Sequence, residues 1–259
     1  MARVVRDRAE ALAVLRDTVR YTVDHPAFAT ATVVGRSLLS TDGPEHARRR
    51  ARFAGRFAID RAWIAEQADA LAGSLGAEAE LREDYAAPLA ATVMKRALDL
   101  EHEVSELLDA MRPIVAATVG DGPLDAGREA FARLAVDADV AVALFGGIDT
   151  MTGMTLIAIL HVLTGQADGV DGSLALDPAV AEVHRYDGDE LVVVRLRDAG
   201  LPFAAGPHAC PAAQLSRLQA RVALEAVLAR EPRLTTPTVP QGTVFRSPVD
   251  LRVNFPGTL

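Results

Sequence analysis

The chain has 259 residues, of which 50% are hydrophobic and 24% charged, and this excludes a disordered protein and fits one sizeable core. Its net charge of −8 argues against nucleic acid or an anionic membrane as the main partner. Cys210 stands alone, so an intramolecular disulfide and a zinc-finger site are excluded.

The first residues do not form a signal peptide, because Arg3, Arg6 and Asp7 interrupt any apolar stretch. The most apolar region, 136–163, carries three aspartates and is a poor membrane span: Asp137, Asp139 and Asp149. We therefore expect a cytoplasmic protein that does not enter a membrane.

Helical periodicity dominates the first two thirds of the chain. Apolar residues recur every three to four positions over 6–20, 44–75 and 84–118, and the last of these ends at the glycines and proline of 120–123. A long, increasingly apolar helix is predicted over 125–163, interrupted only by Gly146 and Gly147.

Shorter elements follow. We expect a loop over 165–176, then a short helix to Tyr186 that begins with Asp177 as its cap and Pro178 in its first turn. The β-branched run 190–196 predicts a strand, 212–229 a helix, and 251–255 a strand-like tail. The pattern indicates one domain, 1–259, that is mainly α with a few short β-strands.

The cysteine lies in a distinctive loop. Cys210 directly precedes the helix predicted over 212–229, where the helix dipole and free amides lower a thiol pKa and tune the sulfur as a ligand. Gly206 lets the backbone approach a flat group, Phe203 can pack on that group, and His208 can donate to an anion. A buried structural cysteine after a Gly-Pro turn is the alternative.

A second motif lies inside the long helix. Gly146 and Gly147 each cost about 1 kcal/mol there relative to alanine, so they indicate either close approach of a flat ligand or close helix packing. Asp149 and Thr150 form a polar pair on an otherwise apolar helix, where polar groups are costly unless they are used.

Two further patterns are ambiguous alone. Glu182 and Arg185, three apart on one helix face, form a commonplace pair. His46 and Arg50, four apart after Asp42 and Pro44, share one helix face, and read alone this pattern fits a solvated basic helix or an RNA-binding helix.

In this order the four motifs resemble those of the cytochrome P-450 superfamily. The resemblance implies a reduced cytochrome P-450-like fold and a haem b cofactor (iron protoporphyrin IX), with Cys210 as the axial ligand of the iron. It also implies that Asp149 and Thr150 relay protons to dioxygen. The residues that it places around the haem are His46, Arg50, Gly146, Gly147, Arg195, Phe203, Gly206, His208 and Cys210.

Within this set the roles differ. The resemblance makes Glu182 and Arg185 a structural ion pair on a helix behind the haem. It places Arg195, His46 and Arg50 against the haem propionates.

The chain is short for a member of that superfamily. The intervals before His46, from Arg50 to Asp149, and from Glu182 to Cys210 all look reduced. The last interval normally holds a sheet, a short helix and a meander. The reductions imply an open pocket for a large or carrier-bound substrate, a pocket completed by a second chain, or a haem fold that has lost oxygen chemistry.

We therefore expect a haem-thiolate monooxygenase that receives electrons from a ferredoxin and its reductase and oxidises a small or carrier-bound organic substrate. One alternative is a haem-thiolate enzyme that does not activate dioxygen reductively: a peroxide user, an isomerase or a dehydratase. The other is a non-catalytic relative that serves as a partner protein. A homo- or hetero-oligomer that covers the reduced regions is a further expectation.

Overall fold

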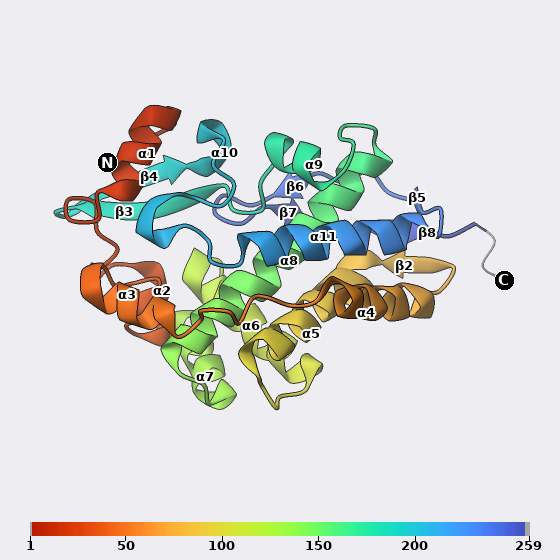
Figure 1. The fold of residues 1–259 in the computed structure, drawn as a ribbon, viewed down its shortest axis with the longest axis horizontal. Helices are drawn as coiled ribbons and strands as arrows, with labels where there is room; N and C mark the ends of the chain where they lie inside the picture. Colours follow the sequence, from red (N-terminus) through yellow and green to blue (C-terminus); the bar gives the residue numbers. More distant parts are fainter. Residues whose placement is uncertain (1, 257–259) are drawn as a thin grey trace.

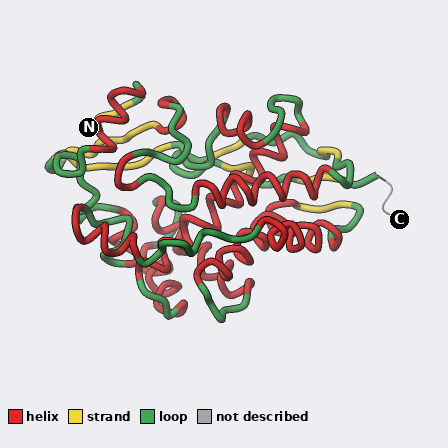
Figure 2. The backbone as a smooth tube through the Cα atoms, in the orientation of Figure 1, coloured by secondary structure: helices red, strands yellow, loops and turns green. Residues whose placement is uncertain are grey.

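A computed structural model describes residues 2–256 (Figure 1). In chain order its elements are β1 (Arg3–Val5), α1 (Arg8–Arg16), α2 (Ala29–Val34), α3 (Gly43–Ala51), α4 (Arg61–Ser74), β2 (Glu78–Glu80), the π-helical turn η1 (Arg82–Ala86), α5 (Ala87–Leu98), α6 (Val104–Val119), α7 (Leu124–Leu134), α8 (Ala138–Leu163), α9 (Val170–Leu176), β3 (Glu182–Asp187), β4 (Glu190–Arg195), α10 (Leu196–Ala199), the 3-10 turn η2 (Gly206–His208), α11 (Ala213–Leu228), β5 (Arg233–Leu234), β6 (Pro240–Gln241), β7 (Ser247–Pro248) and β8 (Arg252–Asn254). The expected mainly α architecture is confirmed (Figure 2).

Helix α8 is the central element of the fold. It begins at Asp137, whose carboxylate accepts the Val140 amide at 3.0 Å, and it packs against α5, α6, α9 and α11. It is apolar on nearly all sides, which is typical of a helix surrounded by other elements. Its length and apolarity would suffice to cross a membrane, but 78% of its most apolar window is buried inside the fold. The surrounding core therefore accounts for its composition.

A small sheet lies at the N-terminal end of the molecule (Figure 1). Strand β3 pairs antiparallel with β4 across a tight turn at Gly188, where φ is +59°, and β1 pairs parallel with the other edge of β4. Helix α1 covers this sheet, and Leu15 packs with Val192 and Val194 in a second core. Helix α1, which packs on this sheet, also contacts η2 in the cysteine loop.

The sequence prediction was wrong between residues 165 and 186. Residues 170–176 form α9 rather than a loop, and 182–187 form strand β3 rather than a helix. The Asp177-Pro178 signal marks a local preference, whereas the hairpin joins six residue pairs and buries Arg185 and Tyr186. Tertiary pairing therefore outweighs the local helix signal.

The predicted long helices are also divided. The helix expected over 125–163 breaks at Ala135, which is left-handed with φ +54°, and α8 begins three residues later at Ala138. Gly146 and Gly147 do not interrupt α8. Breaks also separate α3 from α4, and Asp99, at φ +57°, ends α5 before α6. The strand expected over 190–196, the helix over 212–229 and the strand-like tail are confirmed as β4, α11 and β8.

Candidate functional site

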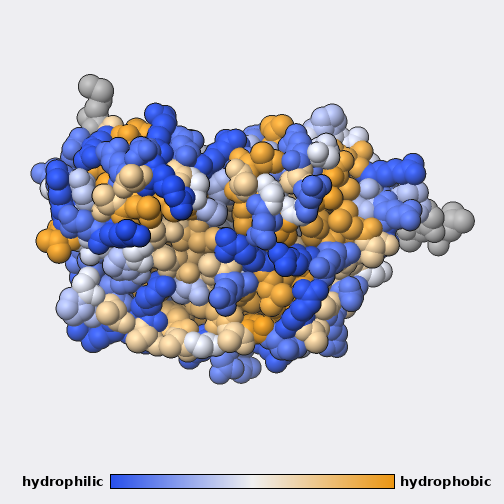
Figure 3. Space-filling model, turned by 45° about the horizontal axis from the view of Figure 1, so that its top comes forward, coloured by the Kyte–Doolittle hydropathy of each residue, from blue (hydrophilic) through white to orange (hydrophobic). Residues whose placement is uncertain are grey.

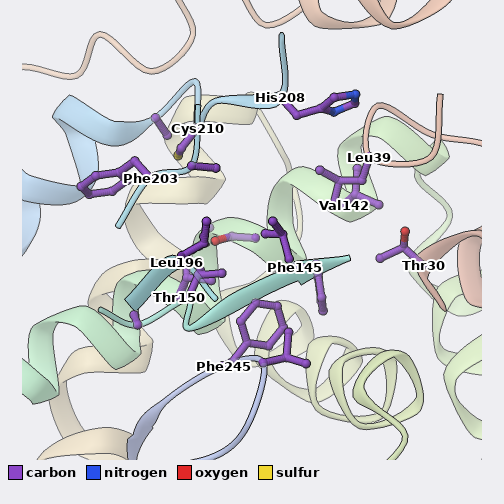
Figure 4. Close-up of a pocket in the computed structure, with 18 of the residues that line it drawn as sticks. Thr30, Leu39, Val142, Phe145, Thr150, Leu196, Phe203, His208, Cys210 and Phe245 are labelled. Carbon is purple, nitrogen blue, oxygen red and sulfur yellow. Dashed lines mark hydrogen bonds between the residues drawn. The ribbon is translucent and has the colours of Figure 1, made fainter. Parts of the chain in front are cut away.

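A cavity of about 340 Å³ lies between α8 and the cysteine loop, and this volume is within the usual range for small-molecule sites, about 300–1,000 Å³. Figure 4 shows Cys210, Phe203 and His208 on one side of the cavity and Thr150, Phe145 and Leu196 on the other. Its walls are mostly apolar. Polar side chains cover much of the face shown in Figure 3, and apolar side chains gather between them near its middle.

Cys210 lies in this cavity, three residues before α11 begins, as the sequence predicted. Burial raises the pKa of its thiol, although the Ala212 amide and the charges of Arg50 and Arg217 act in the opposite direction. The expected lowering of this pKa is therefore wrong, because desolvation outweighs the helix terminus. A buried thiol of this kind becomes a thiolate when a cation binds to the sulfur.

Gly206 lies against the backbone of helix α1. Its φ is +72°, and a Cβ atom there would lie 2.3 Å from the carbonyl oxygen of Leu15. The glycine therefore allows α1 to pack behind the loop, and the approach of a flat ligand at Gly206 stays a prediction. Phe203 does line the cavity, and the Arg217 guanidinium lies 4.3 Å from its ring centre.

A polar cluster closes one edge of the cavity. Asp42 accepts hydrogen bonds from the Thr22 hydroxyl at 2.7 Å and the Val23 amide at 2.8 Å, and its carboxylate lies 2.8 Å from His208 Nε2. Burial raises the pKa of Asp42, but these bonds outweigh burial and bring it down to about 2. Asp42 is therefore a carboxylate at pH 7 and holds the His208 ring in place.

The two histidine rings of this cluster lie against each other. His46, which is buried on α3, has its ring centre 4.0 Å from that of His208. Burial lowers the pKa of His46 to about 4, and burial also lowers that of His208 more than Asp42 raises it. Both rings are therefore neutral at pH 7 and act as hydrogen-bonding groups.

Two arginines beside these rings have no counter-ion among residues 2–256. Arg185, on β3, lines the cavity and is 97% inaccessible to solvent; its Nη1 donates to the His184 carbonyl at 2.7 Å, and its Nε has no partner. Burial lowers its pKa to about 10, so it stays charged at pH 7. Arg50 makes no ion pair in the described part of the chain, and its charge lowers the pKa of both His46 and His208. Such a cluster suits an anion.

Glu182, which the sequence motif pairs with Arg185, forms its ion pair with Arg195 instead. Glu182 Oε2 lies 2.5 Å from Arg195 Nη1, and Glu182 Oε1 lies 3.1 Å from His184 Nε2. Glu182 and Arg185 were expected on one helix face, but on a strand their side chains alternate, so they do not form a pair. Arg195, expected at a propionate, is instead bound to Glu182 and does not line the cavity. Sequence reasoning therefore missed Arg185 as the cavity cation.

Helix α8 supplies the opposite wall. A Cβ atom at Gly146 would meet nothing within 4 Å, whereas one at Gly147 would lie 2.4 Å from the Met94 sulfur. Gly146 thus faces the open cavity, and Gly147 permits close packing of α8 on α5. The Thr150 hydroxyl lines the cavity and donates to the Gly146 carbonyl.

Asp149 does not line the cavity with its neighbour. Burial raises the pKa of its carboxyl group, and the charge of Arg82 acts in the opposite direction. The predicted polar pair is therefore divided, because consecutive helical residues point about 100° apart.

Comparisons with solved structures give one answer. A thermophilic cytochrome P-450 from Sulfolobus tokodaii superposes with a TM-score of 0.82 at 19% identity, over 97% of this chain and 93% of that one. Cytochrome P-450 PksS of Bacillus subtilis gives 0.82 at 16% identity, over 98% and 90%. P-450BioI, in complex with an acyl carrier protein that bears hexadec-9Z-enoic acid, gives 0.83 at 17%, over 97% and 91%.

The chain has the cytochrome P-450 fold. The fold that the four motifs implied is thus confirmed, even though the Glu182 motif lies on a strand. No family model matches the sequence. Nocardicin C N-oxygenase of Nocardia uniformis subsp. tsuyamanensis is 37% identical over 139 residues, which are 51% of this chain and 30% of that protein. The match thus spans less than a third of the relative.

The cytochrome P-450 fold implies a haem cofactor, and the residues around the cavity fit one. A single thiol faces the cavity, Gly146 leaves its opposite wall open, and Arg185, whose Nε has no partner among the described residues, offers a cation to an anionic group. Residues 2–256 hold no cluster of three or more histidine, cysteine, aspartate or glutamate side chains that could bind a bare metal ion. An iron held in a porphyrin requires only an axial ligand from the protein.

Proposed function

We propose that this chain is a haem-thiolate monooxygenase that oxidises a small or carrier-bound organic substrate. The observation that carries the proposal is the placement of the Cys210 thiol and the Thr150 hydroxyl on opposite walls of one cavity. The Arg185 guanidinium, whose Nε has no hydrogen-bond partner among the described residues, lines the same cavity. These are the groups that a haem and a reaction at its iron require.

In this proposal Cys210 ligates the iron of haem b. Arg185 and Arg50 bind the propionates, with the neutral His46 ring as a further donor, while the single N–H of the neutral His208 ring is held by Asp42. The Asp42 carboxylate holds His208 in position from behind. When bound, the haem supplies the reduction of dioxygen and the transfer of one oxygen atom to the substrate.

The chain's own residues bring protons to the cavity and exclude water from it. The Thr150 hydroxyl can turn from the Gly146 carbonyl toward the cavity and donate its proton there. The half-buried Asp149 carboxyl, whose pKa is raised, is the nearest acid along the chain to replace that proton. Phe145 and Phe245 pack edge to face with ring centres 5.2 Å apart, and this pair closes the wall against bulk water.

The known relatives suggest substrate and partner classes. The nocardicin relative is an N-oxygenase, and P-450BioI was solved with an acyl carrier protein, so a compound with an oxidisable nitrogen and a carrier-bound acyl chain are the first substrates to screen. We propose a ferredoxin with its reductase as the electron donor. We also propose a cytoplasmic location, in keeping with the burial of α8 inside the fold.

The test is a comparison of three reaction mixtures with the haemin-loaded protein. One contains ferredoxin, ferredoxin reductase, NADPH and dioxygen; the second contains hydrogen peroxide alone; the third contains neither oxidant nor reductant. Product only in the first supports the proposal. Product only in the second indicates a peroxide user, and product in the third an isomerase or dehydratase.

Thr150→Val serves as the internal control of the same assay. It removes the hydroxyl and keeps the side-chain volume, so NADPH oxidation should continue while hydrogen peroxide replaces product. Unchanged coupling of NADPH to product would exclude Thr150 from proton delivery. A protein that takes up no haemin in any mixture would be a non-catalytic relative.

A further inference from the structure

The cavity extends well beyond the cysteine loop and the polar edge. Figure 4 places Thr30, with Leu39 and Val142, at the side away from Phe203 and Cys210. Helices α2, α6 and α7 converge there, since a Cβ atom at Gly127 of α7 would touch Ala117 of α6 and Val33 of α2. We call this part of the cavity the threonine end, after the residues of α2, of its flanking loops and of α6 that line it: Phe28, Ala29, Thr30, Leu39, Thr118 and Val119.

The Thr30 hydroxyl at this end has no hydrogen-bond partner. Thr30 is 93% inaccessible to solvent, and its Oγ1 is buried without a donor or acceptor among the described residues. Leaving a buried hydroxyl unpaired costs about 1–3 kcal/mol. Thr118 differs, because its hydroxyl already donates to the Ile114 carbonyl at 2.8 Å. Thr30 is thus the free polar donor of the threonine end.

Charge is missing from the same surface. The charged side chains that line the cavity, Glu182 and Arg185, belong to β3, and none of the described residues of the threonine end is charged. An ionised ligand group placed there would lose its hydration without a counter-charge. A carbonyl or ether oxygen would lose little and would gain the Thr30 bond.

We propose that the threonine end recognises the distal part of the substrate, and that this part is uncharged and largely apolar with one oxygen that accepts a hydrogen bond from Thr30. The inference rests on the proposed function, since it names the substrate class of the same cavity. It makes Thr30 a specificity-determining residue that acts in binding and not in proton delivery. Leu39 and Val142 supply the apolar contact around that bond.

The experiment uses two probes with one carbon skeleton. Tetralin is a bicyclic hydrocarbon, and 2-tetralone carries a single carbonyl oxygen on the same skeleton. Calorimetric titration of each into the haemin-loaded protein gives the ratio of their dissociation constants. We expect Thr30→Val, which keeps the volume and removes the hydroxyl, to reduce the preference for 2-tetralone about fivefold and to leave tetralin binding unchanged.

Two variants serve as controls. Thr30→Ser retains a hydroxyl and should keep the preference for the ketone. Thr118→Val removes a hydroxyl from the same end that is already bonded within α6, so the ratio should stay at the wild-type value. An unchanged ratio in Thr30→Val overturns the inference. So does a wild-type protein that prefers tetralin, or that binds neither probe up to its solubility limit.

The proposed function is scored separately in the same samples. The Soret absorption records whether haemin is bound, and the titrations can be repeated on protein without haemin because calorimetry does not require it. Loss of the ketone preference in Thr30→Val without haemin uptake would support the threonine end and contradict the monooxygenase. Haemin uptake together with an unchanged ketone preference in Thr30→Val would agree with the monooxygenase and contradict the role of Thr30.

Discussion

Replacing Arg185 with methionine should maintain or raise the free energy of unfolding and should lower the affinity for haemin. In the protein without haemin, the Arg185 guanidinium is buried and charged, and its one hydrogen bond within residues 2–256 runs from Nη1 to the His184 carbonyl. Methionine has a similar length and no charge to desolvate, so the free energy of unfolding should stay constant or rise. Haemin affinity should fall, because a propionate loses its buried cation.

The expected size follows from the contact that is lost. A hydrogen bond to a charged group is worth about 1.5–3 kcal/mol, which corresponds to a haemin affinity weaker by about 10- to 150-fold. Haemin dimethyl ester has neutral side chains where haemin has carboxylates. Arg185→Met should therefore bind the ester nearly as well as the wild type does, and the selectivity for haemin over its ester should largely vanish.

Arg195→Met is the matched control, since Arg195 is bound to Glu182 and lies outside the cavity wall. Removing it leaves the Glu182 carboxylate with only His184, and the free energy of unfolding should fall by about 1–3 kcal/mol. Selectivity between haemin and its ester should not change. Absorbance titration and urea unfolding give both quantities. The reasoning is refuted if Arg185→Met weakens haemin and ester equally, or if Arg195→Met is the variant that loses selectivity.

Two further predictions concern helix α8 and the response to acid. Gly147→Ala should lower the free energy of unfolding by about 1–3 kcal/mol, because its Cβ would overlap the Met94 side chain. Gly146→Ala should leave the free energy of unfolding unchanged or raise it by up to about 1 kcal/mol, and it should weaken haemin binding. Equal effects of the two variants on stability would contradict the assigned packing. The pKa of His46 in the fold, about 4, and the lowered pKa of His208 lie below the value near 6.5 of the unfolded chain, so the unfolded state binds more protons and stability should fall as the pH drops from 6.5 toward 4. Urea unfolding at a series of pH values checks this, and His46→Gln should flatten the decline; a decline as steep as that of the wild type would assign it to other groups.

An element of this fold is predictable from the sequence when the interactions that decide its conformation lie within its own residues. Helix α11 and strand β4 carry their signals within their own residues, in an apolar face and a β-branched run, and both were predicted within one or two positions. Strand β3 carries a helix-start signal, and its conformation is decided by pairing with β4. No local pattern contains that information.

The same distinction applies to the site. Cys210, Thr150 and His208 were predicted from compact motifs, and the structure brings them to one cavity. The exchange of roles between Arg185 and Arg195 was not predictable, since it depends on which side of β3 and β4 faces the cavity. The partner of Gly206, the backbone of Leu15, comes from α1, nearly two hundred residues earlier in the chain.

The central claim is that the Cys210 thiolate ligates a haem iron in this cavity. The most direct measurement is the absorption spectrum of the haemin-loaded protein after reduction under carbon monoxide, recorded beside that of Cys210→Ala. The account predicts a strongly red-shifted Soret band in the wild type, which thiolate ligation produces, and its loss in the variant. A wild-type Soret band at the position typical of imidazole ligation, or one that the variant retains, would contradict it.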